Sequence, residues 1–314
     1  MSRTQGRRRS RRFKVVQHGP RWLDVFSEQD LKTWAELSEV GQLYSDGVYF
    51  DLEKQRAQNH DALCAALQDA SSIEVEIDNW VRLTDYRWSL TPLSPAGSIR
   101  NIGQRFNIGE DLERARDQFF PALYIGQTFE TGLCEFFGAP LGDSNCGMPL
   151  NEMALRRDSS FTTFKLRGHI EHVLDLTTYE HLKPFADIIR RFNLSVETKR
   201  FAIRKNLKPR ILVTTPYSLW KRVLMPPAEW RQEPNLYGIP ASSQIFGRLV
   251  RDAGFEAIRY PSQQGGELCL AVFNENFVGG SSRIEVIGNG PDGASCTILD
   301  SENLCLDGMR LSTR

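Results

Sequence analysis

Four side chains that could together bind a nucleotide lie within residues 86–138, namely Arg87, Arg105, Tyr124 and Glu135. A guanidinium group binds phosphate oxygens through two parallel hydrogen bonds, and an aromatic ring stacks on other flat rings. A carboxylate beside a sugar stabilises positive charge that develops during bond cleavage. Each residue taken singly is most often a surface or ion-pair residue. It is therefore their arrangement that predicts a nucleotide pocket.

The elements expected around these residues are short and are joined by loops that contain glycine. Arg87 lies at the end of a partly alternating run, WVRLTDYRW, which predicts a strand. Arg105 lies in residues 103–109, a loop with glycine at both ends, where backbone can approach a ligand closely. Tyr124 lies in an apolar run typical of a buried strand, and Glu135 lies in the helix that follows. A carboxylate among apolar neighbours is costly unless it has a partner or a function.

The order of these residues resembles the pattern of the RES-domain family, which comprises NAD-degrading toxins related to ADP-ribosyltransferases. That pattern has an arginine on the first strand, a Gly-Gly-Arg-Trp-Asn loop, a Leu-Tyr strand and a helix with a glutamate. A Trp-Arg pair, a closing helix and a Pro-Ser strand follow. The resemblance spans residues 85–273. The matching segments are, in order, Tyr86-Arg87, Gly103 to Gly109, Leu123-Tyr124, Glu135, Trp230-Arg231, Ser242 to Gly254 and Pro261-Ser262.

The resemblance implies an α+β fold. Its core would be ADP-ribosyltransferase-like, with two small, mostly antiparallel sheets around a nucleotide cleft, outer helices and an N-terminal helical extension. Within the catalytic domain, residues 161–177 predict two strands, and the Gly- and Pro-rich segment 138–159 predicts a long loop that serves as a lid or binding segment. The predicted organisation is a basic tail (1–20), a helical extension (21–80), a RES-like catalytic domain (81–278) and a C-terminal tail with a short strand (279–314).

The resemblance also implies a reaction, cleavage of NAD at the nicotinamide–ribose bond, with water or inorganic phosphate as the acceptor. Glu135 would stabilise the ribosyl cation, Arg87 and Arg105 would clamp the phosphates, and Tyr124 would face the nicotinamide ring. The implied site residues are catalytic Glu135, Arg87 and Tyr124, and substrate-binding Arg105, Asn107 and Ser262. NAD is a substrate in this scheme, and no resident cofactor is expected.

Two other functions stay open on the sequence alone. Transfer of ADP-ribose to a macromolecule would use the same clamp, with the loop at 138–159 as the candidate acceptor surface. A non-catalytic nucleotide-binding or partner-binding module is the other alternative. The joint presence of Arg87, Arg105, Tyr124, Glu135 and Ser262 weighs against it. A role as a toxin or defence effector would imply a neutralising antitoxin protein as a partner.

Composition bears on partners and location. The chain has 314 residues, and equal numbers of basic and acidic side chains, 39 each, give no charge bias toward nucleic acid or membrane. The six cysteines form no Cys-x-x-Cys pair, and no apolar run is long enough for a membrane helix, so we expect a reducing, cytoplasmic location. His169 and His172 lack a third ligand at a matching spacing, so no metal site is predicted.

Overall fold

The computed structural model describes residues 28–115, 118–138, 160–208, 210, 212–225, 228–288 and 290–306. The chain divides into two compact units, one up to Gly41 and one from Gln42 onward. The first unit contributes the beginning of helix α1, where Trp34 is exposed. The basic tail predicted over residues 1–20 and the loop predicted from residue 139 to 159 lie outside the described residues.

Two consecutive helices, α1 (Glu28–Gln58) and α2 (His60–Gln68), precede the first strand. The apolar side of α2 is buried in the core, with Leu63 and Leu67 fully covered. The helical extension predicted up to residue 80 ends earlier, because strand β1 begins at Ser72. The further α-helices of the described residues are α3 (Phe129–Phe137), α5 (Lys183–Ile189), α6 (Val196–Arg204), α7 (Pro216–Leu219), α8 (Gln232–Tyr237) and α9 (Ser242–Asp252).

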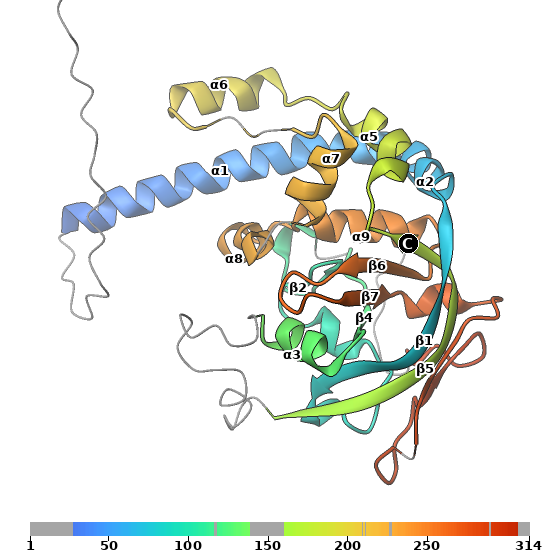
Figure 1. The fold of residues 1–314 in the computed structure, drawn as a ribbon. Helices are drawn as coiled ribbons and strands as arrows, with labels where there is room; N and C mark the ends of the chain where they lie inside the picture. Colours follow the sequence, from blue (N-terminus) through green and yellow to red (C-terminus); the bar gives the residue numbers. More distant parts are fainter. Residues whose placement is uncertain are drawn as a thin grey trace, which may run out of the picture. The chain divides into compact units, whose positions relative to one another are not determined.

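One sheet of the described chain has seven strands in the order β1-β4-β7-β6-β5-β8-β9. β1 also pairs antiparallel with β5 along almost its whole length, so five strands close into a barrel and β8 and β9 extend it (Figure 1). The strands are β1 (Ser72–Asp85), β4 (Leu123–Gly126), β5 (Phe161–Asp175), β6 (Ala257–Pro261), β7 (Leu268–Val272), β8 (Arg283–Val286) and β9 (Ile298–Leu299).

The α+β class is confirmed, whereas the expectation of two small sheets is wrong. β1 and β5 are 14 and 15 residues long, and their mutual pairing closes the single sheet that already runs from β1 through β4, β7 and β6 to β5. A separate two-stranded hairpin, β2 (Gly103–Gln104) and β3 (Asn107–Ile108), is the only other sheet among the described residues.

β5 is continuous where the sequence predicted two strands. The break was expected at Gly168, which has a φ of +143°. A side chain at that position would place its Cβ 1.9 Å from the carbonyl oxygen of Arg283, on the neighbouring strand β8. The glycine therefore permits the close approach of β8, and it does not end the strand.

Apolar clusters on different sides of the strands fix the helices that frame the site. One cluster joins β1, β4, β5, β7 and β8. A second packs the opposite side of β6 and β7 against α2, α5 and α9. On β1, Val81 and Leu83 instead pack against Leu133 of α3. The barrel thus holds α3 against β1 and α9 against β6 and β7.

Candidate functional site

Arg105 lies in the tight turn between β2 and β3. The turn buries the side chain to 7% exposure, and the guanidinium carbon lies 5.6 Å from the centre of the Tyr260 ring. Nη1 of Arg105 is buried and has no hydrogen-bond partner among the described residues. Burying a charged donor without an acceptor is costly, so this nitrogen is a candidate donor to an anionic group of a ligand.

Helix α9 holds the hairpin that carries Arg105. The amide nitrogen of Gln244 donates to three hairpin carbonyls, those of residues 102, 104 and 107, at 2.7, 3.0 and 2.9 Å. One turn along, a Cβ on Gly247 would lie 2.0 Å from the carbonyl oxygen of Phe106. The missing side chain lets helix and hairpin touch through their backbones, and the position of Arg105 follows from that contact.

Tyr124 and Asn107 join strand β4 to the same hairpin. The Tyr124 hydroxyl donates to Oδ1 of Asn107 at 2.9 Å and accepts from the Phe106 N–H at 3.0 Å. Asn107 is fully buried and also donates to the carbonyl oxygen of Phe120 at 3.1 Å. Burial raises the pKa of Tyr124, so the phenol keeps its proton at neutral pH. The hydroxyl is therefore engaged in fixing the hairpin, and the predicted contact of Tyr124 with nicotinamide stays a prediction.

Glu135 and Ser262 come together from helix α3 and from the end of β6. The Ser262 hydroxyl donates to Oε1 of Glu135 at 2.6 Å, and the N–H of Gln263 donates to the same oxygen at 3.1 Å. Ser262 in turn accepts from the N–H groups of Gln264 and Gly265, at 3.1 and 2.7 Å. The serine, predicted to bind ribose or phosphate, is thus held beside the carboxylate, whose position it fixes.

Arg87 lies outside this cluster. The strand expected to carry it ends at Asp85, and Arg87 follows in a short 3-10 turn with its side chain 62% exposed. Its guanidinium pairs with Asp85 at 2.8 Å, apart from the other predicted site residues, and its predicted role in the pocket stays a prediction. The buried arginine of β1 is Arg82, whose Nη1 donates to the Tyr124 carbonyl oxygen at 2.9 Å. Asp85 is a residue type that favours turns, so it could have indicated that the strand ends before Arg87. The arginine within the strand would then have been Arg82.

The comparison with protein families matches residues 79–287 to the RES domain. The chain belongs to the RES domain family. The resemblance inferred from the sequence is thereby confirmed. Among solved structures, similarity is found to a chain of the crystal structure of the M. tuberculosis MbcT-MbcA toxin-antitoxin complex. That match has 15% identity and a TM-score of 0.41, and it covers 73% of this chain and 90% of the other. No curated protein matches the chain.

A third arginine of the RES domain, Arg231, extends the positive charge of the cluster. Burial lowers the pKa of Arg231, the like charge of Arg105 lowers it further, and Glu135 acts in the opposite direction. The Trp-Arg pair was part of the family pattern in the sequence, although Arg231 was not predicted as a site residue. Arg105 and Arg231 thus share one carboxylate neighbour, Glu135, so this part of the RES domain carries excess positive charge.

Tyr260 and Cys269 form the apolar side of the cluster. Burial raises the pKa of both groups, and the Glu135 charge adds to the effect. Each group is therefore neutral at pH 7, and Cys269 has no thiolate character. The Tyr260 ring packs against the Arg105 guanidinium. Tyr260 directly precedes the Pro-Ser segment of the family pattern, and that position is the signal in the sequence that could have indicated it.

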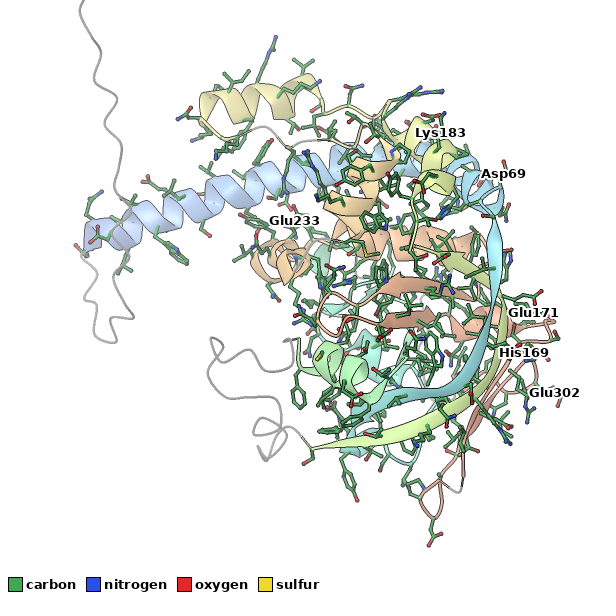
Figure 2. The ribbon with its side chains drawn as sticks, in the orientation of Figure 1. Asp69, His169, Glu171, Lys183, Glu233 and Glu302 are labelled. Atoms are coloured by element: carbon green, nitrogen blue, oxygen red, sulfur yellow. The ribbon has the colours of Figure 1, made fainter. Side chains whose placement is uncertain are left out.

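In the described part of the chain, no group of three or more His, Cys, Asp or Glu side chains could hold a metal ion. His169 and Glu171 of β5 alternate with the buried Ile170 and project from the outer side of the strand (Figure 2). Within the same ranges, every helix is too short or too polar to span a bilayer.

Proposed function

We propose that this RES domain cleaves NAD at the nicotinamide–ribose bond and transfers ADP-ribose to water or to inorganic phosphate. The observation that carries the proposal is the pairing of a fixed carboxylate with an unsatisfied guanidinium. Oε1 of Glu135 is held by Ser262 and Gln263, and the buried Nη1 of Arg105 lies in the same charge cluster without an acceptor. The resemblance to NAD-degrading toxins supports the choice of NAD.

The charge of the cluster suits the pyrophosphate of NAD, which carries two negative charges. Arg105 and Arg82 each bury a guanidinium nitrogen, Nη1 and Nε respectively, that has no partner in the described residues. Both arginines interact electrostatically with Tyr124, so the two vacant donors belong to one neighbourhood. Arg82 thus takes the place that the sequence assigned to Arg87. A pyrophosphate would supply acceptors for both nitrogens and balance the excess positive charge of the cluster.

In the chemical step, the bond between ribose C1′ and the nicotinamide nitrogen breaks. The nitrogen keeps the bonding pair, so nicotinamide leaves as a neutral molecule and positive charge develops on the ribose, as in glycoside hydrolysis. Both donors to Glu135 bind Oε1. The carboxylate is therefore held rigidly, and its other oxygen can face the developing cation. Water or phosphate then bonds to C1′, and water loses its proton in doing so.

An enzyme of this kind would lower the NAD content of the cell that contains it, so we further propose a role as a toxin or defence effector. A neutralising protein partner follows from that role. Its test is expression in a host without the partner, with NAD content followed over time. NAD should fall before growth stops. Growth arrest at constant NAD would contradict the proposal.

The direct test is incubation of the purified full chain with NAD, with and without phosphate, followed by chromatography of the products. Release of nicotinamide with ADP-ribose supports hydrolysis, and release with ADP-ribose phosphate supports phosphorolysis. Covalent ADP-ribose on protein or nucleic acid would support the transferase alternative instead. Binding of NAD without nicotinamide release, under each of these conditions, would support a non-catalytic module.

A further inference from the structure

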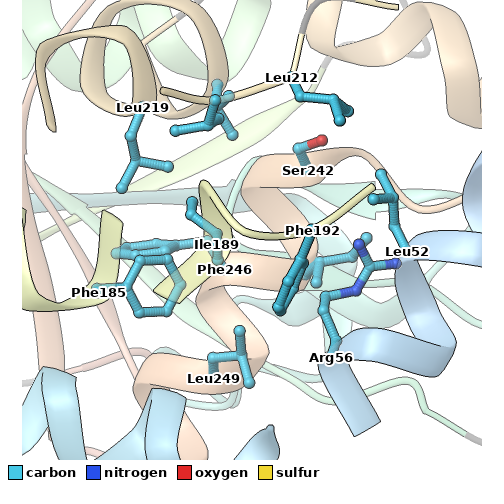
Figure 3. A pocket seen from close by; sticks show the side chains of 13 residues that line it. Leu52, Arg56, Phe185, Ile189, Phe192, Leu212, Leu219, Ser242, Phe246 and Leu249 are labelled. Atoms are coloured by element: carbon cyan, nitrogen blue, oxygen red, sulfur yellow. The ribbon is translucent and has the colours of Figure 1, made fainter. Parts of the chain in front are cut away.

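A second cavity lies in the helical layer, and none of its lining residues belongs to the cluster around Glu135. It has a volume of about 150 Å³. The side chains around it come from α1, from α5 and the loop after it, from residues 212–223 and from α9. Figure 3 shows the rings of its phenylalanines facing the same space. Most of the lining is apolar, with Leu52, Phe185, Ile189, Phe192, Phe246 and Leu249 as its principal members.

One charged side chain, that of Arg56, lies at the edge of this apolar cavity (Figure 3). Its Nε donates to Oε2 of Glu53 at 2.7 Å. Its Nη2 is buried and has no hydrogen-bond partner among the described residues. The side chain is 13% exposed, so bulk water does not readily replace the missing acceptor. Burial also lowers the pKa of Arg56, which shows that its charge is poorly solvated.

The local charge is positive as well. Glu53 is shared, because its other oxygen accepts from Nη2 of Arg248 at 2.9 Å. Gln118, the further partner of Arg248, is neutral. Two guanidinium groups and one carboxylate leave one positive charge beside the apolar space. A single negative charge would balance it and would give the vacant Nη2 an acceptor.

We propose that this cavity binds a small monocarboxylic acid, with its hydrocarbon body among the phenylalanine and leucine side chains and its carboxylate on Arg56. An apolar cavity of about 150 Å³ accepts a body of about six carbon atoms, since a cavity of that size and lining is known to hold benzene. Burial of the hydrocarbon supplies affinity, and the single vacant donor at the edge supplies the preference for an acid.

The site is separate from the NAD site, although both use α9. Residues 242, 245, 246 and 249 face the cavity, whereas residues 244 and 247 contact the Arg105 hairpin. At 3.6 residues per turn, these two sets lie on opposite sides of the helix. Binding in the cavity is therefore expected whether or not the protein cleaves NAD.

The first experiment uses the unaltered full chain and measures binding of hexanoate, phenylacetate, 1-hexanol and hexylamine by calorimetry. The two acids should bind saturably and at least about tenfold more tightly than the alcohol, because a hydrogen bond to a charged group is lost with the hydroxyl. Hexylamine should not bind. Absence of binding by both acids, or equal affinity of acid and alcohol, would overturn the proposal.

Three variants locate the acid. Arg56→Met keeps an apolar stem and removes the guanidinium, so hexanoate affinity should fall at least about tenfold. Ile189→Phe fills the cavity from a half-buried position and should abolish binding. Lys54→Met removes an exposed cation from the same helix and should leave affinity unchanged. Binding retained in Ile189→Phe, or lost equally in Lys54→Met, would refute the assignment, as would displacement of the acid by NAD.

Discussion

Two glutamates, Glu135 and Glu256, accept hydrogen bonds from the same kinds of donor, a serine hydroxyl and backbone N–H groups. Glu135 accepts from the hydroxyl of Ser262 at 2.6 Å and from one backbone N–H at 3.1 Å. Glu256 accepts from the hydroxyl of Ser282 at 2.6 Å and from two backbone N–H groups of β5, at 3.0 and 3.2 Å. A serine–carboxylate bond alone therefore does not distinguish a functional site from a structural one.

The surroundings of the two carboxylates differ. Glu256 is buried, and a Cβ on Gly280 would lie 3.0 Å from its Oε1, so backbone closes over the group. Glu135 is only partly buried and belongs to a cluster in which Arg105 has a donor without an acceptor. The feature that indicates a ligand is thus the unsatisfied charge around the carboxylate, and matched substitutions can test that distinction.

The largest effect is expected from Glu135→Gln. This change keeps the shape and removes the charge beside the ribosyl cation, so NAD turnover should fall by about two or more orders of magnitude. Glu256→Gln is the matched control, and it should lower stability by about 1–3 kcal/mol with turnover per folded molecule unchanged. Thermal unfolding and nicotinamide release measure the two properties. Equal losses of turnover in both variants would erase the distinction between the two glutamates.

The next largest effect concerns the two arginines that the sequence treated alike. Arg105→Ala should weaken NAD binding by about tenfold or more, because a charge-assisted hydrogen bond to phosphate is lost. Arg105→Lys should have an NAD affinity between those of Arg105→Ala and the wild type, because lysine keeps the charge but lacks the planar guanidinium group. Arg87→Ala should have little effect, because that side chain is exposed and paired with Asp85.

Calorimetry in a Glu135→Gln background measures this affinity without consuming NAD. Equal affinities in all of these arginine variants would place Arg105 outside the binding site. A large loss in Arg87→Ala alone would restore the assignment made from the sequence and would mean that the short turn after β1 moves on binding.

Local sequence signals predicted several elements of the site correctly, because those elements are short-range. The order and spacing of Tyr124 and Glu135 follow from a strand, a capped turn and a helix that are consecutive in the chain. Thr128 caps α3, accepting from the N–H of Thr131 at 3.2 Å. The closing helix of the family pattern, matched to 242–254, is observed as α9 over Ser242–Asp252. Periodicity and capping are properties of neighbouring residues, so one sequence suffices for them.

Long-range pairing explains what the sequence did not predict. The end of β1 is set by its register against β5, where Asp85 stands opposite Phe161, and this register separates Arg82 from Arg87. The bond between Ser262 and Glu135 joins residues that are 127 positions apart. Closure of five strands into a barrel is likewise a tertiary property. The catalytic roles of the site residues stay predictions, because geometry alone gives positions and charges.

A smaller effect is expected at the contact between α9 and the hairpin. Gly247→Ala would push a Cβ against the carbonyl of Phe106, so it should lower stability and weaken NAD binding together. Gly47→Ala in α1 is the matched control, since its Cβ would meet a side chain, that of Thr198, at 3.1 Å. That control should change stability by less than about 1 kcal/mol, because alanine favours helix. Unchanged NAD affinity in Gly247→Ala would show that α9 does not position Arg105.

The smallest effect, and one that depends on pH, is expected at a third carboxylate, Asp175. Its two oxygens accept from the guanidinium of Arg259 at 3.1 and 2.7 Å. Burial raises the pKa of Asp175, but hydrogen bonds from Arg259 and Thr177 outweigh it, so the pKa in the folded state lies below the ordinary value. This arginine has its carboxylate partner within the protein, unlike Arg105, so the pair should contribute stability and no activity.

Asp175→Asn should therefore lower stability at pH 7 by about 1 kcal/mol and leave NAD turnover unchanged. The sign of the pH dependence follows from the depressed pKa. The contribution of the pair is fully present above the pKa of the unfolded chain, about 3.9. It is lost as pH falls from there through the lower pKa of the folded state. The free energies of unfolding of the wild type and of Asp175→Asn, measured across this pH range, should converge as the pH falls. A difference in the free energy of unfolding that does not change with pH would mean that packing, and not the ion pair with Arg259, accounts for the stability that Asp175 contributes.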